Sequence, residues 1–215
     1  MRYDRIIMDV QSQDDFFSSS GACYIPAAAV ARRNIAALFR WARQDDIPVI
    51  STVLRVHPHR IGPMADVPHC VDGTDGEDKL AETILPRRTN FGLRNTTDLP
   101  GSIFETVQQV IFEMRFTDIF KHERAERLLT ELNVGTFILC GAGLSQGIQQ
   151  AAVGLRSRGF AVVLARDAVV ALPGPGLEMA LKQIQAKGVI FAPTSEIILT
   201  HPVRRHQPLR LQTQK

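Results

Sequence analysis

The chain has 215 residues, of which 45% are hydrophobic and 22% charged, with a net charge of +3. This length fits one α/β domain with a sizeable core. No apolar run approaches the roughly 20 residues that a membrane-spanning helix needs, which excludes an integral membrane protein. The first residues lead into an apolar strand without the long apolar stretch of a signal peptide, so a cytoplasmic location is expected.

The charge and the cysteines exclude two further classes of protein. The excess basic residues gather in a tail from about residue 201, at Arg204, Arg205, Arg210 and Lys215. No aromatic residues are interleaved with them, which favours a solvated tail over a nucleic-acid-binding arm. The three cysteines, Cys23, Cys70 and Cys140, are odd in number and widely spaced. They indicate neither a disulfide framework nor a zinc knuckle.

Apolar strands and amphipathic helices alternate along the chain. Strands are predicted at 5–10, 47–54, 106–114, 134–140, 160–169 and 189–193, and helices at 26–43, 123–131, 145–158 and 177–187. Such alternation is typical of a parallel sheet covered by helices on both faces. We predict a single Rossmann-like domain over 1–215, with three α/β/α layers and a mostly parallel sheet of six strands.

The segment 55–105 is irregular and holds three of the six histidines and five prolines. A loop of this length inside a domain is usually functional or poorly ordered. Parallel sheets place their ligand sites beyond the carboxyl ends of the strands. These ends bring Asp9 and Gln11, His57 and His59, Met114 and Arg115, 141–147, and Arg166 and Asp167 around one predicted cleft.

Four motifs occur in the order found in one known family. They are IIMDVQSQDDFF (6–17), HCVDGTDGEDKL (69–80), MRFTDIF (114–120) and CGAGLSQGIQQAAVGLRSRGFAVVLARDAV (140–169). Together they resemble the isochorismatase-like cysteine hydrolase superfamily, which includes nicotinamidases and related amidases. The resemblance covers residues 5 to about 193, and it implies a homodimer or homotetramer.

The resemblance also implies a catalytic set of Asp, Lys and Cys, in which a thiolate at a helix N-terminus attacks a carbonyl and the carboxylate moves the proton. Asp9 stands at the Asp position, whereas Met114 stands at the Lys position and Gly147 at the Cys position. Gln11, Phe16, Leu144 and Ser145 are expected around them. Arg55, Arg88 and Arg115 are candidates to supply a cation to Asp9.

Other residues are weaker candidates for a nucleophile. Ser145 lacks a histidine or lysine partner, and we expect it to cap the following helix. Cys140 ends a strand, where a buried hydrophobic role is expected. Asp9 itself has an alternative interpretation as a cap of the neighbouring turn.

Some members of the resembled family bind a metal through an Asp-x-His motif after the second strand and the histidine of the His-Cys loop. This chain has Arg55, Val56 and His57 in the first place and His69 in the second. A guanidinium repels a divalent cation, so we expect no metal and loop histidines held by hydrogen bonds. The alternative is a zinc site in which His59 joins His57 and His69.

Two functions follow from these substitutions. The first is a member of the fold that lacks cysteine-hydrolase activity and binds a small molecule or serves as an assembly subunit, without a cofactor, nucleic acid or membrane. The second is an active hydrolase of the isochorismatase type, which uses Asp9 as general acid and base without a thiol nucleophile.

Overall fold

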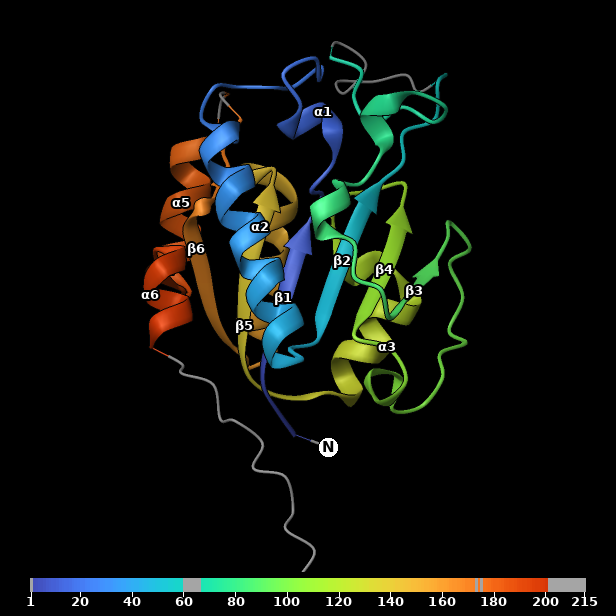
Figure 1. Cartoon of the computed structure of the whole chain (residues 1–215), viewed down its shortest axis with the longest axis vertical. Coiled ribbons are helices and arrows are strands. Elements are labelled where there is room, and N and C mark those ends of the chain that lie inside the picture. Colours follow the sequence, from blue (N-terminus) through green and yellow to red (C-terminus); the bar gives the residue numbers. More distant parts are fainter. Residues whose placement is uncertain (1, 60–66, 173, 175, 201–215) are drawn as a thin grey trace, which may run out of the picture.

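The computed structural model of the chain describes residues 2–59, 67–172, 174 and 176–200, and it shows one parallel sheet between two layers of helices (Figure 1). The predicted three-layer α/β fold is confirmed. The sheet has seven strands where six were predicted, and every pair of neighbouring strands in it runs parallel. The predicted basic tail from residue 201 lies outside the described residues.

The strands follow the order β3-β4-β2-β1-β5-β6-β7 across the sheet. Their bounds are β1 Arg2–Val10, β2 Val49–Leu54, β3 Arg88–Phe91, β4 Gln109–Met114, β5 Asn133–Ala142, β6 Ala161–Val170 and β7 Ile190–Ala192. All six residues of β2 are buried, as expected for a parallel strand that is covered on both faces. The central position of β1 brings its carboxyl end between those of β2 and β5 (Figure 1).

The helices were predicted well, apart from two short ones. Their bounds are α1 Asp14–Phe17, α2 Ala28–Asp45, α3 Glu123–Glu131, α4 Gln149–Ser157, α5 Leu177–Ala186 and α6 Thr194–Leu199. Helices α1 and α6 were missed because four and six residues are too few to show helical periodicity. The predicted helix 145–158 is divided into a π-helical turn, η6 (Leu144–Ile148), and α4.

Two hydrophobic cores lie on opposite faces of the sheet. Helices α1, α2 and α6 cover one face, which we call the α2 face, and α3, α4 and α5 cover the other, which we call the α4 face. Helix α2 buries Ile35, Leu38, Phe39 and Trp41 against the α2 face. The seventh strand, β3, lies within the irregular segment 55–105. Its four residues, RTNF, alternate between exposed and half-buried, which is too short and polar a pattern for prediction.

The core of the α4 face contains a histidine without hydrogen-bond partners. His122 is 1% exposed, and its ring lies 4.8 Å from that of Phe112, measured between centroids. Neither ring nitrogen has a partner among the described residues. Burial, together with the charge of Arg124, lowers the pKa of His122 to about 4. The imidazole is therefore neutral at pH 7.

His122 makes the stability of the fold depend on pH. The pKa of a histidine in the unfolded chain is about 6.5, so the unfolded state takes up the proton first as the pH falls. The free energy of unfolding should fall by up to about 3 kcal/mol between pH 6.5 and pH 4. Urea titrations at pH 6.5 and pH 4 measure the free energy of unfolding of the wild type and of His122→Phe. The fall with pH should be smaller in the variant by the contribution of His122. Equal pH dependence in the two proteins would contradict the assignment.

Candidate functional site

The turn that follows β5 has no room for a side chain at Gly147. Gly143, with φ of +77°, leads into η6, and Gly147 is buried within it. A Cβ atom built on Gly147 would lie 2.8 Å from Val10 Cγ1, 3.3 Å from Gln11 Nε2 and 3.3 Å from the carbonyl oxygen of Thr117. The first of these distances is shorter than real Cβ contacts. A cysteine at this position would therefore require its neighbours to move.

Three of the other expected pocket residues are buried, whereas Ser145 is half-buried. Met114 is 1% exposed, Phe16 is 1% exposed and Leu144 is 6% exposed. Met114 and Leu144 belong to the core on the α4 face, whereas Phe16 belongs to the core on the α2 face. These residues pack as core side chains and do not line an open cleft.

Gln11 lies beside the Gly147 turn. Its backbone has a φ of +53°, and its side chain is buried without a hydrogen-bond partner for either amide atom among the described residues. The two amide atoms lie near Gly143 and Gly147. Gln13 differs, because its amide bonds to both the N–H (2.7 Å) and the carbonyl (2.8 Å) of Leu54 and so ties β1 to β2.

Asp9 was assigned from the spacing Asp-x-Gln. The same spacing occurs again two residues later, with a glutamine in place of the aspartate. The first fit is Asp9 with Gln11, and the second is Gln11 with Gln13. The side chain beside Gly147 is that of Gln11. Asp9 lies two residues before Gln11 in β1. Its side chain contacts Ser51 of β2 and Lys79 of the irregular segment 55–105. Gln11 therefore lies beside Gly147, the position at which the resemblance places a cysteine.

Asp9 has a cation that the sequence analysis missed. Lys79 forms an ion pair with Asp9 Oδ2, and Ser51 Oγ donates to the same oxygen at 2.9 Å. Ser12 Oγ donates to the other oxygen. The side chain of Asp9 is fully buried and that of Lys79 is 6% exposed. The expectation that Arg55, Arg88 or Arg115 would supply the cation is wrong.

Lys79 reaches Asp9 because its segment pairs with the chain that follows β1. Lys79 and Gln13 form an antiparallel bridge, Asp14 N–H donates to the Asp78 carbonyl at 2.9 Å, and Leu80 N–H donates to the Ser12 carbonyl at 3.0 Å. The lysine ammonium also lies 5.7 Å from the centre of the Phe39 ring in α2. A pair enclosed in this way is a rigid part of the fold.

None of the three thiols has the lowered pKa of a catalytic cysteine. Burial and the charge of Asp9 raise the pKa of Cys140 far above its usual range. Burial raises the pKa of Cys70 and, to a lesser extent, that of Cys23. Because the thiolate is the nucleophile, these thiols are inert in this fold.

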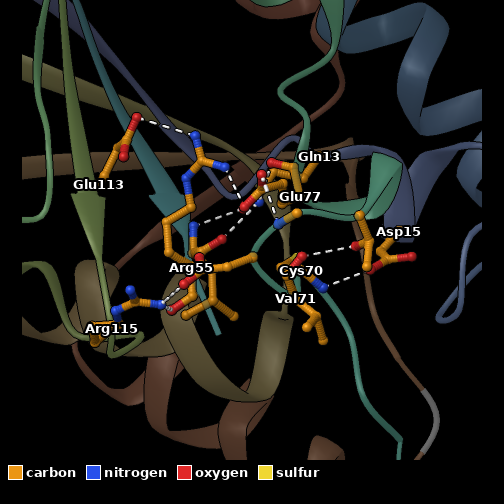
Figure 2. A network of polar contacts seen from close by, with 12 residues as sticks. Gln13, Asp15, Arg55, Cys70, Val71, Glu77, Glu113 and Arg115 are labelled. Atoms are coloured by element: carbon orange, nitrogen blue, oxygen red, sulfur yellow. Dashed lines mark hydrogen bonds and ion pairs between the residues drawn. The ribbon is translucent and has the colours of Figure 1, made fainter. Parts of the chain in front are cut away.

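A guanidinium occupies the end of β2, where the resemblance places a metal-binding carboxylate. Figure 2 shows Arg55 between Glu77 and Glu113, with which it forms ion pairs. Arg115 donates to the carbonyl of Arg55 at 3.1 Å and pairs with Asp72 at 2.5 Å. The guanidinium thus pairs with both carboxylates at this point and would repel a divalent cation, so these residues do not fit one.

The three candidate histidine ligands are not gathered. His57 and His59 are exposed, and the backbone N–H of His59 donates to His57 Nδ1 at 3.2 Å. His69 is buried, packs edge-on against Phe16 and has its Nδ1 2.8 Å from the carbonyl of Val67. Over the described ranges, no three His, Cys, Asp or Glu side chains are placed to hold a metal ion.

One smaller expectation about the strand ends is corrected. Ser145 does not cap the helix, because η6 already begins at Leu144 and Gly143 precedes it. Asp167 anchors the segment that begins α6 and is not paired with Arg166. Its Oδ1 accepts hydrogen bonds from the N–H and hydroxyl of Thr194, both at 2.8 Å, and so holds the start of α6.

Comparison with known proteins agrees with this geometry at the level of the fold. Residues 6–196 match the model of the isochorismatase domain. A search of curated protein sequences gives no match. Among solved structures, nicotinamidase PncA from Bacillus subtilis is similar with a TM-score of 0.66 and 20% identity, covering 88% of this chain and 99% of that one.

Two further solved structures have similar values. N-carbamoylsarcosine amidase from Thermoplasma acidophilum has a TM-score of 0.64 and 16% identity over 91% of this chain and 98% of its own. Pyrazinamidase from Pyrococcus horikoshii, solved in complex with zinc, has a TM-score of 0.65 and 20% identity over 88% and 99%. At this level of sequence identity, the structural similarity shows that the fold is shared. The activities named for the three solved proteins are theirs and are not transferred to this chain.

Proposed function

Since this chain belongs to the isochorismatase family, we propose that it is a member without cysteine-hydrolase activity, which acts by binding a small molecule. The observation that carries the proposal is the packing at Gly147, where a Cβ atom would lie 2.8 Å from Val10 Cγ1. A side chain at the position of the expected nucleophile would therefore displace its neighbours, and glycine supplies no thiol there.

Three further features support the proposal. Met114 is a buried core residue where the resemblance places a lysine. The pKa of each cysteine thiol is raised by burial. Gln11, the side chain beside Gly147, carries an amide, which cannot act as a general base. The thiol and the lysine expected from the resemblance are thus both absent from their positions, whereas Asp9 is present.

A second candidate function is hydrolysis without a thiol, with Asp9 as general acid and base. The observation that favours it is Lys79, which gives Asp9 the ammonium partner that position 114 lacks. Both side chains are enclosed, however, and the Asp9 carboxylate is already occupied by two hydroxyls and the ammonium. A substrate would reach this carboxylate only if the segment around Lys79 opened.

A hydrolysis panel separates the two candidates. We expect the purified chain at high concentration to release no ammonia from nicotinamide, pyrazinamide or N-carbamoylsarcosine, and no pyruvate from isochorismate. An active nicotinamidase serves as the positive control. Turnover that is lost in Asp9→Asn and retained in the matched exposed variant Asp46→Asn would establish the second candidate and overturn the first.

The proposal extends to the setting of the protein. Within the described part of the chain, no helix is long and apolar enough to cross a membrane. We propose a cytoplasmic homodimer or homotetramer that needs no cofactor. Sedimentation analysis of the purified chain tests its oligomeric state.

A further inference from the structure

A second site lies at the opposite end of the sheet from Gly147. A cavity of about 130 Å³ lies between the amino halves of β5–β7 and helix α6. Its apolar wall is formed by the branched or small side chains of Ile138, Val163, Ala192 and Ile197. An engineered apolar cavity of about 150 Å³ binds benzene, so this one has room for a body of four to six heavy atoms.

Two residues of opposite charge, Arg5 and Glu196, line this cavity without an ion pair to any described residue. The guanidinium of Arg5 lies 5.5 Å from the centre of the Trp41 ring, and Asp4 and Asp45 act on it only through space. Arg5 makes no ion pair with any described carboxylate, and neither does Glu196 with any described cation. Both nevertheless line the same cavity.

Two hydroxyls complete the polar part of the lining, those of Thr136 and Thr200. The Thr200 hydroxyl donates to the Glu196 carbonyl at 2.7 Å, which leaves its oxygen able to accept. An apolar pocket with a few convergent polar groups is the usual form of a small-molecule site. Arg5 is half-buried and Glu196 is exposed, and each can form a charge-assisted hydrogen bond with a ligand group of opposite sign.

We propose that this cavity binds a small zwitterion with a branched aliphatic body, of the size of free leucine. The carboxylate pairs with Arg5, the ammonium group pairs with Glu196, and the aliphatic body fills the space between Ile138, Val163 and Ile197. The site is separate from the Gly147 turn, so it stands whether or not the chain hydrolyses amides.

Calorimetric titration of the full chain with leucine and two of its fragments tests this assignment. The fragment 4-methylpentanoate lacks the amine, and 3-methylbutylamine lacks the carboxylate. Leucine should bind at least tenfold more tightly than either fragment. Absence of leucine binding, or equal affinity for leucine and a fragment, would overturn the proposal.

Paired variants assign the two charges. Arg5→Gln should weaken leucine and 4-methylpentanoate about tenfold and leave 3-methylbutylamine unchanged. Glu196→Gln should weaken leucine and 3-methylbutylamine alone. Arg2→Gln, an exposed arginine on the same strand, is the control and should change none of them. If Arg2→Gln weakened binding as much as Arg5→Gln, the loss of affinity would reflect the net charge of the protein and not a contact with Arg5. That result would overturn the proposal.

Filling the cavity tests the apolar wall. Ala192→Leu and, separately, Val163→Ile should abolish leucine binding while the thermal transition of the protein remains cooperative. If leucine still binds with unchanged affinity to a folded variant of either kind, the ligand lies outside this cavity and the proposal is wrong.

Discussion

Replacing Lys79 by methionine is expected to lower the free energy of unfolding by about 3–5 kcal/mol, because it leaves the carboxylate of Asp9 buried without its cation. The side chain of Asp9 is 0% exposed to solvent, and its ion-pair partner is Lys79. The two hydroxyls of Ser12 and Ser51 remain, but hydroxyl hydrogen bonds alone do not offset the desolvation of a carboxylate.

The double variant Asp9→Asn/Lys79→Met distinguishes a coupled pair from two independent side chains. Because it removes both charges, its loss should be smaller than the sum of the two single losses by at least about 1 kcal/mol. Arg115→Met serves as the control, since Arg115 and Asp72 form a half-exposed pair and its loss should be about 1 kcal/mol or less. Urea denaturation at pH 7 of the wild type, Asp9→Asn, Lys79→Met, the double variant and Arg115→Met measures these losses. Additive losses in the double variant would contradict the coupling.

Returning a lysine to position 114 should also destabilise the fold. Met114 is 1% exposed and packs in the core on the α4 face. Met114→Lys would place an ammonium there, and we expect a loss of about 3 kcal/mol or more, because no described carboxylate pairs with it. Met114→Leu conserves the volume and should cost less than about 1.5 kcal/mol. Equal stability of the two variants would mean that position 114 opens to water, and that the closed site described above is wrong.

The order of strands and helices could be predicted because it rests on local apolar patterns. The helix predicted at 123–131 agrees with α3 at both ends, and each predicted strand overlaps a strand of the sheet. The β3 strand could not be predicted, since its four residues are held by pairing with β4 and not by a pattern of their own.

The contents of the candidate site were only partly predictable. Gly147 and Met114 could be found because the motifs fix their positions along the chain. Lys79 could not, because it meets Asp9 across 70 residues, and the antiparallel bridge that brings it there leaves no local signal. Gln11 lies close to Gly147, but its positive φ and this closeness depend on how β1 ends and could not be predicted from the sequence.

The side-chain amide of Gln11, which has no hydrogen-bond partner among the described residues, shows why the motif alone could not predict the site. Gln11 and Gln13 are two residues apart and chemically identical, yet Gln13 ties β1 to β2 while both amide atoms of Gln11 are unpartnered among the described residues. An unpartnered buried amide costs stability.

The central claim, that the core has filled the nucleophile position, is tested most directly by the stability of Gly147→Ala in two backgrounds. In the wild type, the added Cβ meets Val10 Cγ1, and we expect a loss of about 1–3 kcal/mol. In a Val10→Ala background that contact is gone, and alanine should cost less than about 0.5 kcal/mol or stabilise the helical turn. A harmless Gly147→Ala in the wild type would show that the slot is open and would contradict the claim.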